Sequence, residues 1–172
     1  MINSIIVSDL DKATNINFIK KNDINAIISV ININYADVLD SFQYQCPFQT
    51  KKFYFDDTVD IKKLDAPTKT DVINIINEIK SLIESNRSVN LLVHCLAGIS
   101  RSPAVALIAI RLNNPPEFSD DDCVDHLMTK SVKNICFPNS LIVGYADQFL
   151  SSNLVDAVER YLEKNLIKSL NS

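Results

Sequence analysis

The chain has 172 residues, of which 47% are hydrophobic and 22% are charged, and its formal net charge is -4. This length provides for one substantial hydrophobic core and is too short for two ordinary domains, so we expect a single domain over residues 1–172. The negative balance excludes a general attraction to nucleic acid or to anionic membranes. No stretch approaches the roughly 20 apolar residues of a membrane span, and the N-terminus does not resemble a secretory leader, so we expect a cytoplasmic protein.

The cysteines are too widely scattered for a zinc module, and a chain with this much core does not need disulfide bonds. We therefore expect reduced thiols, no metal site and no cofactor. The four cysteines are Cys46, Cys95, Cys123 and Cys136.

The first half of the chain reads as strands alternating with helices. Runs rich in Ile and Val predict strands at Ile5–Ser8 and Ala26–Ile31, and the spacing of apolar residues between them predicts a helix over Lys12–Asn22. We expect a helical turn over Tyr35–Phe42 and a third strand over Lys51–Phe55.

Helices dominate the second half. Pro67 stands where a helix would begin, and apolar residues then recur at helical intervals as far as Ile83. A buried strand is expected over Ser88–Val93, followed by an apolar helix over Pro103–Leu112. Capping residues and spacing predict three further helices, of which the last belongs to a C-terminal helical cap over residues 151–172. These helices are Ser119–Lys130, Asn139–Leu150 and Leu154–Leu170.

The alternation predicts an α/β fold with a central, mainly parallel sheet of four to five strands flanked by helices. In such a sheet, ligands bind at the carboxyl ends of the strands. Cys95 falls at one of these ends, between the strand Ser88–Val93 and the helix Pro103–Leu112.

A short turn between that strand and that helix carries the chemistry. It runs His94-Cys95-Leu96-Ala97-Gly98-Ile99-Ser100-Arg101-Ser102, with a cysteine near one end and an arginine near the other. Successive backbone N–H groups can curl around one anion, and Gly98 tolerates the positive φ that this requires. The predicted phosphate-binding residues are Leu96, Ala97, Gly98, Ile99, Ser100 and Arg101.

A thiol is a poor nucleophile until it ionises, and this turn supplies what ionisation needs. The backbone N–H groups, the start of the following helix and the Arg101 guanidinium all favour an anion at the centre. The planar guanidinium can also bind two phosphoryl oxygens at once. Ser102 is placed to hydrogen-bond the Cys95 sulfur, and His94 is expected to orient the turn rather than to transfer protons.

His94 to Ser102 resembles the signature of the cysteine-dependent protein tyrosine phosphatase superfamily, which is His-Cys, five residues, then Arg and Ser or Thr. The sequence from Ala97 to Ser102 is similar to that of the compact dual-specificity branch. The later segment Pro138-Asn139-Ser140-Leu141-Ile142, with Ala146-Asp147, is similar to small bacterial-type members. The resemblance extends from about Ile5 to Leu150. It implies a protein tyrosine phosphatase-like fold and a two-step reaction in which Cys95 takes the phosphoryl group and water releases it.

The leaving oxygen needs a proton, so a carboxylic acid has to reach the turn from elsewhere. The segment Phe55-Asp56-Asp57-Thr58, at the end of the third predicted strand, is the best source, and family members carry their acid in this region. The resemblance favours Asp57 as the general acid, and as the base for water in the second step. Asp56 is the second choice and Asp60 the third.

Several polar residues have more than one interpretation. Asn139 is expected to cap its helix, with a contact to the site as the alternative. His126 is expected to be solvated on a surface helix. Cys46 is a weak candidate for a disulfide with an oxidised Cys95.

We expect a phosphatase of phosphotyrosine in proteins, with phosphoserine and phosphothreonine as further substrates. The side chains of Leu96, Ala97, Ile99 and Ser100 are uncharged, which disfavours polyanionic ligands such as phosphoinositides or RNA 5' ends. These remain alternatives, as does a catalytically silent module that binds phosphoproteins. Retention of Cys95 argues against that module, since a binder needs the arginine and the turn but not the thiol.

Overall fold

The computed structural model describes residues 1–37, 49–85, 87–132 and 136–170. In this part of the chain, four parallel strands form one sheet in the order β1-β4-β2-β3. The predicted α/β class with a parallel central sheet is confirmed. The strands are β1 (Ile2–Ser8), β2 (Ala26–Ile31), β3 (Gln49–Tyr54) and β4 (Val89–His94).

Strand β4 lies inside the sheet, between β1 and β2. At its carboxyl end, His94 is in register with Ser8 of β1 and with Ser29 of β2. The chain that leaves β4 therefore enters a space bordered by the ends of both neighbouring strands. This is where Cys95 lies.

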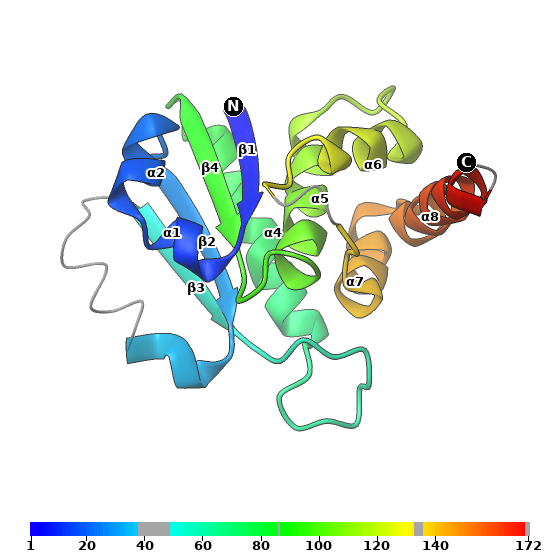
Figure 1. Ribbon diagram of the computed structural model, residues 1–172, viewed down its shortest axis with the longest axis horizontal. Helices are drawn as coiled ribbons and strands as arrows, with labels where there is room; N and C mark the ends of the chain where they lie inside the picture. Colours follow the sequence, from blue (N-terminus) through cyan, green and yellow to red (C-terminus); the bar gives the residue numbers. More distant parts are fainter. Residues whose placement is uncertain (38–48, 86, 133–135, 171–172) are drawn as a thin grey trace.

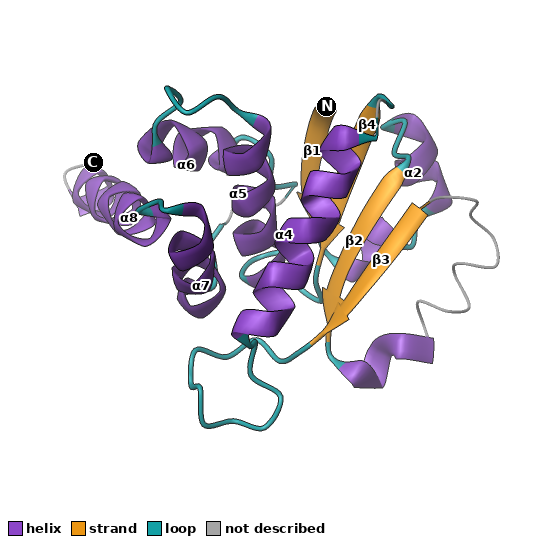
Figure 2. Cartoon of the chain, turned by 180° about the vertical axis from the view of Figure 1, so that it is seen from behind, coloured by secondary structure: helices purple, strands orange, loops and turns teal. Residues whose placement is uncertain are grey.

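Each face of the sheet is covered by helices (Figures 1 and 2). The short helices α1 (Leu10–Ala13) and α2 (Ile16–Lys21) cover one face, where Ile19 packs in a small cluster with Ile27 and Leu92. The longer helices cover the other face, and the last three lie beyond α5, away from the sheet. They are α4 (Lys69–Glu84), α5 (Arg101–Asn113), α6 (Asp120–Met128), α7 (Ser140–Leu150) and α8 (Leu154–Leu170).

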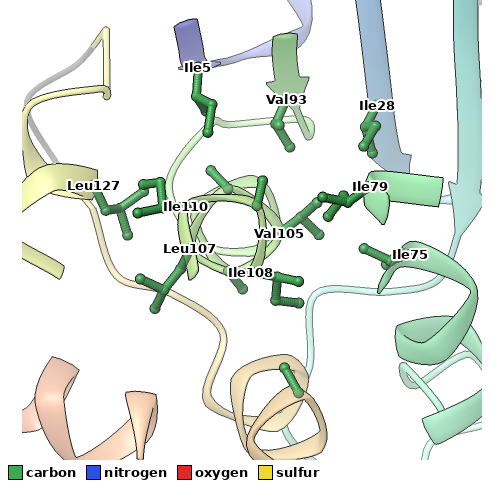
Figure 3. Packing of buried hydrophobic residues seen from close by; sticks show 14 of the residues in the cluster. Ile5, Ile28, Ile75, Ile79, Val93, Val105, Leu107, Ile108, Ile110 and Leu127 are labelled. Atoms are coloured by element: carbon green, nitrogen blue, oxygen red, sulfur yellow. The ribbon is translucent and has the colours of Figure 1, made fainter. Parts of the chain in front are cut away.

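Helix α5 lies at the centre of the main core. Every residue from Arg101 to Ile110 is buried, and Figure 3 shows Val105 and Ile110 extending from this helix among side chains of the sheet and of the surrounding helices. Burial of one such side chain stabilises the fold by about 1.5–3 kcal/mol. The first turn of α5 is thereby anchored directly behind the turn that follows β4.

Several predicted boundaries change in the structure. The expected helix Lys12–Asn22 is two helices, because the Asn15 side chain accepts hydrogen bonds from the N–H groups of Asn17 and Phe18 and starts α2 there. Pro67 lies before α4, whose N-cap is Thr68. Helix α5 begins at Arg101, before the expected start at Pro103.

The helical turn expected over Tyr35–Phe42 is described only in part. A 3-10 helix spans Ile33–Tyr35, and the expected turn from residue 38 onward lies outside the described residues. Among the helices in the described ranges, none has the length and apolar character needed to cross a membrane.

Candidate active site

The turn after β4 closes tightly around the Cys95 side chain, which is 1% exposed. The Gly98 N–H donates a hydrogen bond to Cys95 Sγ over 3.2 Å, and the Ser102 hydroxyl donates another over 3.1 Å. Gly98 has a φ of 76°, a conformation that side chains other than glycine rarely adopt. Two donors directed at one sulfur stabilise negative charge there.

The turn is also held from outside. The Leu10 N–H donates to the Leu96 carbonyl over 3.2 Å, and the Phe137 N–H donates to the Ile99 carbonyl over 2.8 Å. These contacts come from the segments after β1 and before α7. They fix the backbone in the curved shape that an anion site needs.

His94 supports the base of the turn as a neutral side chain. Its Nε2 lies 2.6 Å from the Ser29 hydroxyl, and its Nδ1 lies 3.4 Å from the carbonyl oxygen of Cys95. Burial lowers the pKa of His94 to about 4, although the Cys95 carbonyl and the charge of Asp9 act in the opposite direction. An uncharged imidazole at neutral pH fits the orienting role predicted for His94, which stays a prediction.

The Arg101 guanidinium is 3% exposed and is held from one side. Its Nη1 donates to the Phe55 carbonyl over 2.7 Å and to Asn32 Oδ1 over 3.1 Å. Asn32 in turn donates to the carboxylate of Asp56. Arg101 Nε is buried and has no hydrogen-bond partner, although the Asp57 carboxylate lies 3.8 Å from it. An anion seated in the turn would satisfy this donor.

Asp57 is the predicted acid that contacts the turn. Its Oδ1 accepts hydrogen bonds from the Ser100 hydroxyl over 2.6 Å and from Asn139 Nδ2 over 2.9 Å. The Asp57 side chain is 38% exposed, so it borders both the turn and the solvent. Asp56 instead contacts Asn32, and Asp60 accepts from the Lys62 N–H. The structure thus brings together Cys95, Arg101 and Asp57.

Asn139 has both of the contacts considered for it. Its Oδ1 accepts from the N–H groups of Leu141 and Ile142 and caps α7, while its Nδ2 reaches Asp57. Asn32 was not predicted from the sequence. The available signal was its position directly after β2, at the carboxyl edge of the sheet.

The remaining cysteines and histidine lie in different surroundings. Cys123 and Cys136 are buried, and burial raises the pKa of Cys123 to about 11 and the pKa of Cys136 to about 12. Cys46, proposed as a disulfide partner, lies outside the described residues. His126 is exposed, as expected, and its ring is nearly perpendicular to the ring of Phe118, with an interplanar angle of 86°. Within the described ranges, no three His, Cys, Asp or Glu side chains are grouped as metal ligands.

Comparisons with solved structures give the same fold. A phosphatase from Cydia pomonella, PTP-2, is 18% identical with a TM-score of 0.63, and the match covers 85% of each chain. A human tyrosine phosphatase-like serine/threonine/tyrosine-interacting protein is 17% identical with a TM-score of 0.61, covering 86% of this chain and 91% of that one. PTPMT1 in complex with PI(5)P is 12% identical with a TM-score of 0.57, covering 92% and 94%.

A search of curated proteins found no match. The family model described as "Polymorphic toxin system, DSP-PTPase phosphatase" matches residues 9–113, which is more than half of the chain and includes the whole turn from His94 to Ser102. The chain therefore belongs to this family of dual-specificity-type phosphatase domains, within the cysteine-dependent protein tyrosine phosphatase superfamily.

Proposed function

We propose that the protein hydrolyses phosphotyrosine, and also phosphoserine and phosphothreonine, in protein substrates through a phosphocysteine intermediate. The observation that carries this proposal is the environment of Cys95. Its sulfur accepts hydrogen bonds from Gly98 and Ser102, and the arginine of the same turn has a buried Nε without a hydrogen-bond partner. A sulfur nucleophile and an anion site therefore share one centre.

The first step transfers the phosphoryl group. Cys95 Sγ forms a bond to phosphorus while the bond to the leaving oxygen breaks, and Asp57 donates its proton to that oxygen. The backbone N–H groups of the turn and the Arg101 guanidinium stabilise the charge on the equatorial oxygens. The alcohol or phenol then leaves.

The second step restores the enzyme. The Asp57 carboxylate takes a proton from water, the water oxygen attacks phosphorus, and the S–P bond breaks to give phosphate and the thiolate. The Ser102 hydroxyl, 3.1 Å from Cys95 Sγ, stabilises the departing thiolate. A nucleophilic thiol has to stay reduced, so we place this reaction in the cytoplasm.

The proposed preference for protein substrates rests on the uncharged side chains of the turn. Leu96, Ala97, Ile99 and Ser100 add no positive charge beyond Arg101, and a phosphomonoester in a protein needs none. The fold itself does not distinguish the substrate classes, because PTPMT1 was crystallised with a phosphoinositide. A panel of phosphopeptides, phosphoinositides and RNA 5' triphosphates with the purified protein separates them.

The decisive experiment is hydrolysis of p-nitrophenyl phosphate by the full chain, with and without a chelator. We expect vanadate-sensitive turnover that the chelator leaves unchanged and that Cys95→Ser abolishes. Asp57→Ala should lower kcat by about 10²–10⁴ with phenyl phosphate, while Asp56→Ala should lower it less. A folded wild-type protein with no more activity than Cys95→Ser would overturn the proposed catalysis.

A further inference from the structure

Asn139 joins three parts of the site through one side chain and one backbone group. Its Nδ2 donates to Asp57 Oδ1 over 2.9 Å and to the Thr58 carbonyl over 3.2 Å. Its Oδ1 caps α7, and its backbone N–H donates to the Ser100 carbonyl over 3.1 Å. Asn139 itself is 4% exposed, so its amide is shielded from water on the side away from Asp57.

Ser100 provides the second donor to the same carboxylate oxygen. Its hydroxyl lies 2.6 Å from Asp57 Oδ1, and its carbonyl is the acceptor of the Asn139 N–H. Asp57, Ser100 and Asn139 thus form a closed set of hydrogen bonds, although they come from three separate segments. Both hydrogen bonds hold the Asp57 carboxylate through Oδ1, and the other oxygen, Oδ2, lies 3.8 Å from Arg101 Nε.

We propose that Asn139, with Ser100, is a positioning residue that holds the Asp57 carboxyl group at the phosphate-binding turn. This inference rests on the proposed phosphatase function and deepens it. Both donors bind Oδ1, so the proton to be transferred is carried on Oδ2, which faces the side of Arg101. Since a misplacement of about 1 Å can cost about a hundredfold in rate, the Asn139 amide and the Ser100 hydroxyl contribute to catalysis by holding Asp57, whereas the backbone N–H of Ser100 is among the groups predicted to bind the phosphate.

The test separates positioning from helix capping. Asn139→Asp and Asn139→Ser both keep an oxygen that caps α7, because Asp, Ser and Asn are comparable N-caps, but both remove the amide Nδ2 that donates to Asp57. Asn15 offers a matched control, since its side chain caps α2 with similar hydrogen bonds of 3.0 and 3.1 Å. Asn15→Asp should leave turnover unchanged.

The readout is the dependence on the leaving group. Phenyl phosphate needs a proton on its leaving oxygen, whereas dinitrophenyl phosphate scarcely does. We expect Asn139→Asp to lower kcat with phenyl phosphate by about 10- to 100-fold and kcat with dinitrophenyl phosphate by less than about threefold. Ser100→Ala, which leaves the cap of α7 intact, should show the same selectivity to a smaller extent.

A double-mutant cycle completes the test. In an Asp57→Ala background, Asn139→Asp should have no further effect on phenyl phosphate, because the group it positions is absent. Equal losses with both substrates, or additive losses in the double variant, would overturn the positioning role while leaving the phosphatase itself established. A wild-type protein that hydrolyses neither substrate would overturn the proposed function, and the inference with it.

Discussion

Gly98 lies so close to Ser8 that a Cβ atom on the glycine would stand 2.6 Å from the carbonyl carbon of the serine. It would also stand 2.7 Å from the Asp9 nitrogen. Both neighbours are backbone atoms at the end of β1, so they cannot turn aside as a flexible side chain would. The turn that contains Cys95 therefore packs directly against the backbone at the carboxyl end of β1.

Replacement of Gly98 by alanine should disrupt this fit. We expect Gly98→Ala to lower the free energy of unfolding by more than about 1 kcal/mol and to reduce kcat/KM for p-nitrophenyl phosphate at least about a hundredfold. Chemical denaturation and steady-state kinetics measure both effects. Gly144→Ala is the control, because its Cβ would meet only Val155 Cγ2 at 3.8 Å, and it should stabilise helix α7 by about 0.5–1 kcal/mol. Similar effects of the two substitutions would refute the steric argument.

Arg101→Lys tests the guanidinium rather than the charge. Lysine keeps a positive charge but lacks the planar guanidinium group. In Arg101, Nη1 of this group donates to Phe55 and Asn32, and Nε is left for the proposed substrate. We expect kcat/KM to fall about 10²–10³-fold. Arg160→Lys is the matched control, since Arg160 forms a two-pronged but exposed pair with Asp121, and it should leave kinetics unchanged. A kcat/KM of Arg101→Lys within about fivefold of the wild-type value would contradict the role assigned to the guanidinium group.

Buried His94 should make stability depend on pH. Its pKa is about 4 in the folded protein and 6.5 as the ordinary value, so below pH 6.5 the unfolded chain takes up the proton first. The stabilisation associated with a neutral His94 is therefore complete above pH 6.5 and is lost as pH falls toward 4. The expected slope is at most about 1.4 kcal/mol per pH unit.

The measurement is the difference in free energy of unfolding between wild type and His94→Gln across this range. Asp122 and His126, whose pKa values are also lowered, are present in both proteins, so their contributions cancel. The difference should be constant above pH 7 and should shrink toward pH 4. A difference that is flat from pH 7 to pH 4 would show that His94 has the same pKa in the folded and the unfolded states, and would contradict the lowered pKa.

Alkylation should distinguish the cysteines. Burial raises the pKa of Cys123 to about 11 and that of Cys136 to about 12, so at pH 7 both remain thiols, which alkylate slowly. We expect iodoacetamide to label Cys95 before Cys123 and Cys136, and inorganic phosphate to protect Cys95, as measured by mass spectrometry of the separated peptides. Labelling of Cys136 as fast as Cys95, or labelling of Cys95 that phosphate does not slow, would contradict this expectation.

The part of the site between β4 and α5 could be predicted from the sequence. The strand, the turn and the helix follow one another along the chain, so the local sequence specifies each of them. The parallel sheet could be predicted from the alternation of elements. The strand order could not, because the position of β4 between β1 and β2 depends on packing rather than on order along the chain. The break between α1 and α2 was hidden because the apolar spacing continues across it, and the hydrogen bonds of Asn15 decide the boundary.

Residues that act over long sequence distances were the hardest to predict. Asn32 contacts Arg101 across 69 positions, and nothing local to either residue indicates the pair. The choice between Asp56 and Asp57 rested on family resemblance. The structure adds a physical reason, because the two neighbours face different partners, Asn32 and Ser100 respectively. Their catalytic roles, and the single domain expected over residues 1–172, stay predictions.

The support of the turn from both sides has a consequence for when, during synthesis, the protein would acquire the proposed activity. The nine residues from His94 to Ser102 are shaped by Leu10 on one side of the sequence and by Phe137 and Asn139 on the other. A nascent chain whose residues have left the ribosome only as far as the end of α5 contains the whole segment from His94 to Ser102. It still lacks the contacts of Phe137 and Asn139 that support this segment. Competence for phosphoryl transfer should therefore arise late in translation, once the segment leading into α7 has folded back onto the turn.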